Sequence, residues 1–154
     1  MLKLFRVGLV LFLNSMLLAD NAPGPLAAVQ KFFDAMSAHD ASAVHALFAP
    51  DSTTTAIGPD GTVSTAHSEN FEQRLSSSNE PWLERIWDAK VMEHAGMAVV
   101  WAPYDFYRAG KFNHCGIDNF NLVKIDGKWR VASVLFTVER ENCPASPLGP
   151  PQVH

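Results

Sequence analysis

The sequence predicts an α+β domain in which N-terminal helices pack on a strongly bent antiparallel sheet. Apolar residues recur at helical spacing early in the chain. Glycine-containing turns then divide the stretch from 83 to 140 into four long segments rich in β-branched and aromatic residues. The chain has 154 residues, 47% of them hydrophobic and 18% charged, which suits one domain with a single core.

The first helix is predicted to begin at Pro25, because proline at the first helical position has a suitable fixed φ and needs no N–H. The apolar positions that follow at helical spacing are Leu26, Val29, Phe33 and Met36. These residues predict one apolar face that packs against the sheet.

A second, shorter helix is predicted after Asp40, which is a suitable N-cap residue. Its apolar residues are Val44, Leu47 and Phe48, and Pro50 lies just beyond its end. A strand over Thr53–Ile57 leads into a Gly-Pro-Asp-Gly turn at 58–61. A weakly amphipathic third helix is predicted over Ser68–Leu75, before a polar linker at 76–80.

The rest of the domain is predicted to consist of β-hairpins. The four strands are Leu83–Glu93, Met97–Arg108, Phe112–Ile125 and Lys128–Arg140. The turns between them are Ala95-Gly96, Ala109-Gly110 and Asp126-Gly127, and the last is a strong hairpin signal. Pro103 predicts an edge position or a bulge in the second of these strands. The domain should end near 143, because the proline-rich tail over 144–154 is predicted to be disordered.

Residues 1–19 have the pattern of a secretory signal peptide. Lys3 and Arg6 precede a mostly apolar run from Val7 to Leu18, and Ala19 offers a small residue at the cleavage position. The alternative is an anchor that stays attached. Cleavage would change the formal net charge from −4 to −6 and leave an acidic domain over 20–143 that is periplasmic or secreted.

Charge and cysteine usage limit the partners of the domain. Lys and Arg number 12 against 16 Asp and Glu, which disfavours nucleic acid as a partner. Cys115 and Cys143 are the only cysteines, and in an oxidising compartment such a pair most simply forms a disulfide. Two buried free thiols are the alternative. The chain has no CxxC or HExxH spacing, so we expect neither a metal nor another cofactor.

The register of the last hairpin predicts which side chains face the helices. A two-residue turn at Asp126-Gly127 places Trp129 opposite Lys124 and Ser133 opposite Phe120. Since strand side chains alternate between faces, we expect the helix-facing surface to carry Phe120, Leu122, Trp129, Val131 and Leu135.

The preceding hairpin predicts a polar end to this surface. With a two-residue turn at Ala109-Gly110, His114 lies opposite Asp105 and Trp101 lies opposite Asp118. Buried charges cost several kcal/mol unless they are paired or hydrated, which favours a cavity there, with a buried pair that only fixes the sheet as the alternative. The candidate catalytic residues are Asp118, His114 and Asp105. The candidate ligand-pocket walls are Trp101, Tyr107, Phe120 and Phe33.

The same alternation predicts an apolar outer face on the sheet. Its members would be Tyr104, Phe106, Ile117, Val134, Phe136 and Val138. A monomer seldom exposes so large an apolar patch, so we expect a homodimer formed through this face.

Four segments resemble one known superfamily. They are VQKFFDAM at 29–36, FAPD at 48–51, GKFNHCG at 110–116 and FNLVKIDGKWRV at 120–131. Together with the order of elements, they resemble the nuclear transport factor 2-like, or SnoaL-like, superfamily over about residues 25–143. The resemblance is closest to its exported bacterial members in the putative lumazine-binding or uncharacterised group. It implies a cone-shaped domain with a pocket between helices and sheet.

Three function classes follow from this resemblance and from the residues. The first is an exported small-molecule-binding protein that uses the pocket. The second is an acid–base enzyme of the isomerase, cyclase or dehydratase kind, because ketosteroid isomerases and polyketide cyclases of similar fold use a pocket carboxylate beside hydrogen-bond donors. Asp118 or Asp105 would then be the base, and His114 or Tyr107 the donor. The third is a protein-interaction domain that acts through the outer sheet face.

Overall fold

The computed structural model describes residues 23–151 and confirms the α+β class. Three helices are present in this part of the chain: α1 (Pro25–Ser37), α2 (Ala41–Leu47) and α3 (Ser68–Ser77). The strands are β1 (Phe48–Ile57), β2 (Val63–His67), β3 (Trp82–Ile86), β4 (Lys90–His94), β5 (Met97–Arg108), β6 (Lys111–Ile125) and β7 (Lys128–Thr137). The predicted signal peptide lies outside the described residues. None of the described helices is both long and apolar enough to cross a bilayer.

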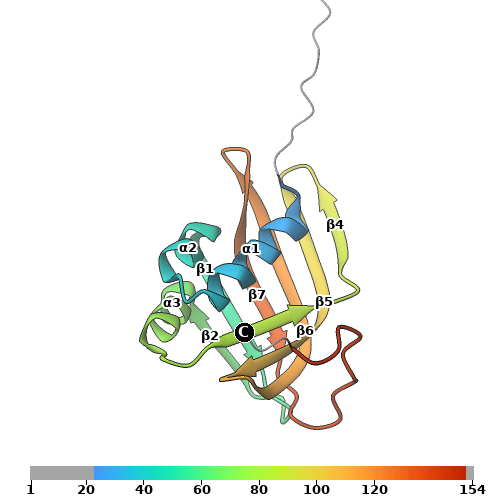
Figure 1. The fold of residues 1–154 in the computed structure, drawn as a ribbon. Helices are drawn as coiled ribbons and strands as arrows, with labels where there is room; N and C mark the ends of the chain where they lie inside the picture. The colour runs from blue at the N-terminus through green and yellow to red at the C-terminus, as the bar shows by residue number, and fades with distance from the viewer. Residues whose placement is uncertain (1–22, 152–154) are drawn as a thin grey trace, which may run out of the picture.

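The strands form one curved sheet in the order β2-β1-β7-β6-β5-β3, and β4 pairs with the other half of β5 (Figure 1). The sheet is mixed rather than purely antiparallel, because β1 runs parallel to β7. A parallel pair needs a long connection between its strands, and the whole stretch from β2 to β6 provides it.

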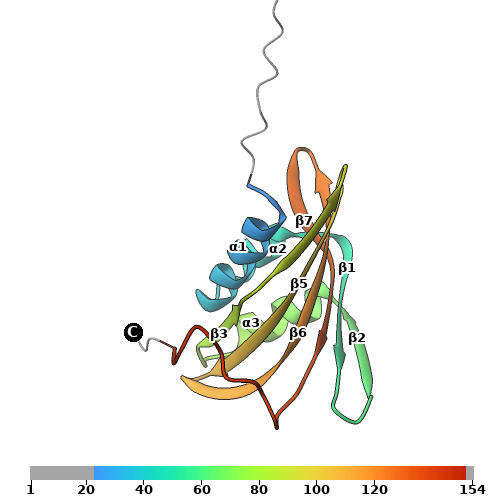
Figure 2. The ribbon, with the colours of Figure 1, turned by 90° about the vertical axis from the view of Figure 1, so that its right-hand side faces the viewer.

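The helices cover the concave side of the sheet (Figure 2). Helix α1 buries Val29, Phe33 and Met36 against the strands as its apolar spacing predicts, and Phe32 beside them, whereas the predicted Leu26 is 42% exposed. Asp40 caps α2 by accepting a hydrogen bond from the backbone N–H of Ala43 at 2.8 Å, which confirms the predicted cap. The two helices and the sheet therefore enclose one core.

Two strand predictions differ from the structure. The predicted strand over 83–93 is broken into β3 and β4 around Asp88, whose φ of 46° lies in the left-handed region and turns the chain. Strand β2, which follows the predicted turn, was not expected from the sequence, because its exposed and polar residues carry no apolar alternation.

The register predicted for the β5–β6 hairpin is wrong beyond its first two pairs. Tyr107 lies opposite Phe112 as predicted, but a bulge places Asn113 as an extra residue on β6, so that His114 lies opposite Phe106. One extra residue moves every later side chain of the partner strand to the other face. Asp105 consequently points away from the helices.

The β6–β7 hairpin contains a second bulge. Its predicted pairs hold as far as Leu122 and Val131, and then Ala132 is the extra residue, so that Phe120 lies opposite Val134 rather than Ser133. Beyond the bulge the inner face of β7 carries Val134 and Phe136 instead of Leu135.

These shifts remove the apolar outer patch predicted to drive dimerisation. Tyr104 and Phe106 are 1% and 8% exposed within the core, and Val134 is also buried there. Phe136 packs partly buried against the same core. The surface predicted for the dimer is therefore wrong. Homodimerisation itself stays a prediction, and no surface is now assigned to it.

The Cys115–Cys143 disulfide is confirmed, with a Cα–Cα distance of 6.0 Å. Beyond β7 the backbone of Glu139 exchanges two hydrogen bonds with Cys115, at 2.8 and 2.9 Å. The chain then folds back at Asn142, whose φ is 58°, and returns Cys143 to β6. After the disulfide, residues 144–151 form no helix or strand, although the Gly149 carbonyl accepts a hydrogen bond from Arg85 at 2.9 Å. Disorder of the tail stays a prediction.

Gly116 is required where the end of β7 crosses β6. A Cβ atom at this position would clash with the Thr137 carbonyl oxygen, which itself accepts a hydrogen bond from the Tyr104 hydroxyl at 2.6 Å. We expect Gly116→Ala to lower the free energy of unfolding by about 3 kcal/mol, because backbone atoms must move to make room. Gly96→Ala is the control, since its Cβ would meet only Lys124 at 3.8 Å. Equal midpoints of urea unfolding for the two variants would contradict this account.

Candidate functional site

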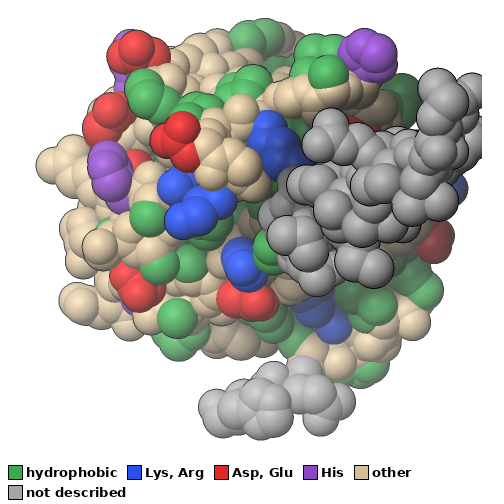
Figure 3. All heavy atoms as spheres, turned by 90° about the horizontal axis from the view of Figure 1, so that it is seen from above, with side chains coloured by type: hydrophobic (Ala, Val, Ile, Leu, Met, Phe, Trp, Pro, Cys, Tyr) green, Lys and Arg blue, Asp and Glu red, His purple; other side chains and the backbone are tan. Residues whose placement is uncertain are grey.

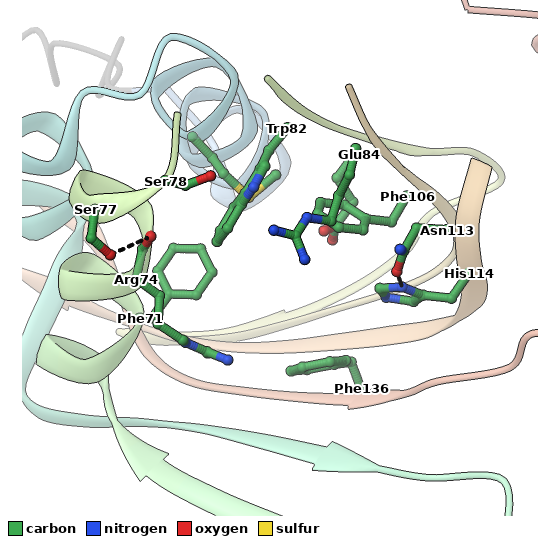
Figure 4. A pocket seen from close by; sticks show the side chains of 12 residues that line it. Phe71, Arg74, Ser77, Ser78, Trp82, Glu84, Phe106, Asn113, His114 and Phe136 are labelled. Carbon is green, nitrogen blue, oxygen red and sulfur yellow. Dashed lines mark hydrogen bonds between the residues drawn. The ribbon is translucent and has the colours of Figure 1, made fainter. Parts of the chain in front are cut away.

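A cavity of about 480 Å³ opens between α1, α3 and the concave face of the sheet (Figure 4). Trp82 and Phe136 lie on opposite sides of it in the close view. Its apolar lining consists of Met36, Phe71, Trp82, Phe106 and Phe136. Its polar lining consists of Arg74, Ser77, Ser78, Glu84, Arg108, Asn113 and His114. We call this space the aromatic cavity.

The aromatic cavity continues inward into a small extension of about 50 Å³. The two spaces share Met36, Phe71, Glu84 and Phe136, and the extension adds Asp118. The pocket therefore has a wide aromatic mouth and a narrow acidic inner end.

Two carboxyl groups meet at the inner end. Strand β3 contributes Glu84 and strand β6 contributes Asp118, and their side chains are hydrogen-bonded to each other. Asp118 is 2% exposed, and its Oδ2 atom has no hydrogen-bond partner among the described residues. A buried polar atom without a partner costs free energy, which a ligand that donates a hydrogen bond would recover.

The electrostatics of this pair follow from its burial. Removal from water raises the pKa of Asp118 to about 7. Removal from water, followed by the nearby Asp118 charge, raises the pKa of Glu84 well above its ordinary value. At neutral pH the pair consequently keeps at least one proton, and Glu84 can donate it to Asp118.

His114 lies on β6 opposite Phe106 of β5, and both side chains line the cavity. Its ring centroid lies 4.9 Å from that of Phe106 and 5.6 Å from that of Tyr104. The Nδ1 atom lies 2.7 Å from Asn113 Oδ1, an oxygen that can only accept, so Nδ1 carries the hydrogen. Burial, with a smaller contribution from Arg140, lowers the pKa of His114 to about 4. The imidazole is therefore neutral at pH 7, and Nε2 can accept a hydrogen bond.

The two arginines of the cavity differ in their partners. Arg108 pairs with Glu80 at 3.0 Å, and its guanidinium carbon lies 5.7 Å from the centroid of the Trp82 ring. Arg74, on the last turn of α3, makes no side-chain hydrogen bond or ion pair with any described residue. Arg74 is consequently the cation that remains available to a bound molecule.

The structure brings together only part of the predicted site. Asp118 and His114 line the cavity and its extension, and Phe120 lines the extension. Phe33 lies in the core, where its ring contacts Phe120 at a centroid distance of 5.5 Å.

The remaining predicted site residues lie on the opposite face of the sheet. Asp105 is paired with Arg85, whose Nε donates to Oδ1 at 2.9 Å, and the same guanidinium lies over the Tyr107 ring. Trp101 is 49% exposed. The predicted pairing of His114 opposite Asp105 is therefore wrong, and the register shift at Asn113 is the reason.

Sequence reasoning missed Glu84, Trp82 and Arg74. For Glu84 a signal was present: Trp82, Glu84 and Ile86 alternate along one strand, so that an acidic residue occupies an otherwise apolar face. Arg74 gave no such signal, because charged residues are common on exposed helix positions.

The site offers hydrogen-bond and acid–base chemistry. The carboxyl pair can donate or accept a proton, and neutral His114 can accept a hydrogen bond. In the part of the chain that the structure describes, no three His, Cys, Asp or Glu side chains are grouped so as to hold a metal ion. On the face seen in Figure 3, basic side chains lie beside acidic and apolar ones.

Comparison with protein families gives a match over most of the chain. The model of the family described as "Putative lumazine-binding" matches residues 24–137. No curated protein shows a significant sequence match.

Several solved structures share the fold. A nuclear transport factor 2-like protein from Cytophaga hutchinsonii is 18% identical, covers 73% of this chain and 93% of its own, and has a TM-score of 0.62. One from Novosphingobium aromaticivorans with a cystatin-like fold is 13% identical, with coverages of 73% and 77% and a TM-score of 0.61. A putative dehydratase of the same superfamily from Streptomyces avermitilis is 12% identical, with coverages of 74% and 92% and a TM-score of 0.59. At these identities the likeness concerns the fold alone.

Proposed function

The chain belongs to the putative lumazine-binding family, and from that premise we propose that it binds a small planar heteroaromatic molecule in the aromatic cavity. The observation that carries the proposal is a cavity of about 480 Å³ with aromatic walls and an unpartnered buried carboxylate oxygen at its inner end. Ligand pockets have this size, and a few placed polar groups in an apolar lining orient the ligand.

The polar groups limit the chemistry of the ligand. Asp118 Oδ2 accepts a hydrogen bond, and Nε2 of neutral His114 accepts another. A ring with an N–H group at its edge fits these acceptors, and its faces stack against Trp82 or Phe136. Lumazine has such a ring, which is why the family name and the geometry support the same class of ligand.

Titration with lumazine, followed by the NMR signals of the protein, tests this proposal. We expect the shifted signals to cluster on Trp82, Phe106 and His114, and Ser78→Trp to weaken binding at least tenfold by filling the cavity. Ser76→Trp is the matched control, since Ser76 is exposed on the same segment and does not line the cavity. Shifts away from the cavity, or equal affinities for the two tryptophan variants, would refute the assignment.

We further propose that the domain works in an oxidising compartment outside the cytoplasm. The Cys115–Cys143 disulfide supports this location, as does the signal-peptide pattern of residues 1–19. N-terminal sequencing of the protein from its native host should find a chain that starts near Asp20. A chain that still begins at Met1 would count against cleavage.

A further inference from the structure

The C-terminal tail, which we define as residues 144–151, follows the Cys115–Cys143 disulfide and returns to the edge strand β3. A turn closes within it, because the backbone N–H of Gly149 donates to the Ser146 carbonyl at 3.2 Å. Figure 1 and Figure 2 both show this segment running back beside β3. The tail is therefore attached to the body of the domain beyond the end of the last strand.

Both attachment points of the tail lie on one row of the sheet. Arg85 on β3, Asp105 on β5 and Cys115 on β6 are successive cross-strand neighbours, so their side chains share the outer face. The disulfide fixes the tail at Cys115. At the β3 end of the row, the Gly149 carbonyl accepts a hydrogen bond from Arg85 Nη1 at 2.9 Å. The tail consequently bridges three strands, from β6 to β3.

Arg85 joins the tail to a buried charge. Its Nε atom donates to Asp105 Oδ1 at 2.9 Å, and the side chains of Arg85 and Asp105 are only 15% and 5% exposed. A buried carboxylate needs such a partner, because an unpaired buried charge costs several kcal/mol. Asp105 therefore holds the guanidinium in place, with Nη1 aimed at the tail. A charged donor forms a stronger hydrogen bond with the Gly149 carbonyl than a neutral one would.

The tail also covers a groove behind one carboxyl of the candidate site. This groove has a volume of about 340 Å³ and is lined by residues of α1, by residues 83–86 of β3 and by Leu148 of the tail. Leu148 is half-buried there. Glu84 lines both this groove and the aromatic cavity. A change in the position of the tail would therefore reach the carboxyl pair through β3.

Strand β3 is the part of the site with the least support from the sheet. It has five residues and is an edge strand, paired with β5 on one side only among the described strands. Short elements with few neighbours open most easily in a folded protein. Yet β3 supplies Trp82 and Glu84, which are one wall and one carboxyl of the aromatic cavity.

We propose that the tail is a redox-sensitive strap that holds β3, and with it Trp82 and Glu84, in the position that binds the ligand. The part of this inference that concerns binding rests on the function proposed above, whereas the part that concerns β3 stands without it. In the reductive step a dithiol supplies two electrons and two protons, becomes a disulfide itself and leaves Cys115 and Cys143 as thiols. The tail then loses its anchor on β6, which lowers the effective concentration of the Gly149 carbonyl at Arg85.

Amide hydrogen exchange of the free protein tests the strap. A chain that ends at Ala145 keeps the disulfide and lacks Leu148 and Gly149, and a chain that ends at Pro151 is the matched control. We expect the β3 amides to exchange about tenfold faster in the shorter chain, because the hydrogen bond from Arg85 to the tail is lost. The amides of β2, at the opposite edge of the sheet, are the internal reference and should exchange at the same rate in both chains.

Dithiothreitol and lumazine then test the anchor and the link to the site. Reduction of the full chain should accelerate β3 exchange about as much as the truncation does, and it should cause no further acceleration in the chain that ends at Ala145. Saturating lumazine should slow β3 exchange in both chains and leave β2 unchanged, because a ligand that binds only the closed position of β3 increases its population.

Three results would overturn the inference. Equal β3 exchange in the two chains would show that the tail does not hold the strand, as the disorder predicted for 144–154 implies. An acceleration by dithiothreitol that persists in the chain ending at Ala145 would show that the disulfide acts on β3 without the tail. Lumazine that binds without slowing β3 exchange would separate the strand from the site. Absence of lumazine binding would refute the proposed function, whereas the exchange rates of the free protein would still decide whether the tail holds β3.

Discussion

Removing the disulfide with Cys115→Ala and Cys143→Ala is expected to lower the free energy of unfolding by about 3 to 4 kcal/mol. The 28-residue separation between the cysteines gives this value in the chain-entropy model, because the cross-link restricts the unfolded chain. For a domain of this size the melting temperature should fall by roughly 10 °C or more. Cys115 is 3% exposed in the sheet, so alanine there also leaves a small cavity.

The reductant response separates the cross-link from the packing change. Dithiothreitol should lower the melting temperature of the wild-type protein and leave that of the double-alanine variant unchanged, as measured by circular dichroism. The wild-type protein can also be denatured and refolded in dithiothreitol, so that the disulfide is reduced. An unchanged melting temperature after this treatment would contradict a stabilising disulfide.

Asp118→Asn is expected to stabilise the protein increasingly as pH rises. The pKa of Asp118 is raised from an ordinary 3.8 to about 7 by burial, so between these values the folded protein binds a proton that the unfolded chain has released. The contribution of Asp118 to the unfolding free energy of the wild-type protein is therefore fully present below about pH 4 and is lost as pH rises through 7. One proton corresponds to about 1.4 kcal/mol per pH unit.

The measurement is the difference in unfolding free energy between variant and wild type, obtained from urea curves at several pH values. His114 changes the unfolding free energy in the opposite direction, because its lowered pKa costs stability as pH falls from about 6.5 to about 4. This contribution cancels in the difference, since both proteins contain His114. Asp126→Asn in the exposed β6–β7 turn is the matched control for the same substitution at the surface. A difference for Asp118→Asn that does not change with pH would contradict a buried, protonated Asp118.

The same pair predicts the pH dependence of binding. A ligand that donates to Asp118 prefers the carboxylate, so its affinity should rise with pH up to about 7 and then level off. We expect His114 to contribute nothing to this dependence, because burial keeps it neutral through this range.

What the sequence predicts well depends on local patterns. Helical spacing located α1, and the tight turns located the hairpins. Asp118 and His114 were placed correctly because both lie on β6, at even spacing from Phe120. Alternation within one strand does not depend on how that strand pairs with its neighbours.

Placement across strands failed because of two extra residues, Asn113 and Ala132. Neither is a glycine or proline, so the sequence carries no bulge signal there, and each moves a whole strand segment to the other face. Asp105 and Trp101 were consequently assigned to the cavity although they lie outside it. Glu84 was missed although it alternates with Trp82 and Ile86 on one face, because the pairing of β3 with β5 decides where that face lies.

Carbon-13 NMR titration of the Asp118 side-chain carboxyl, without and with saturating lumazine, tests the central claim most directly. The account predicts a midpoint near pH 7 in the free protein and a lower midpoint in the complex, since a hydrogen bond from the ligand favours the carboxylate. The Asp118→Asn variant identifies the signal. A midpoint near the ordinary value of 3.8, or a raised midpoint that lumazine does not move, would contradict a ligand site at this carboxyl.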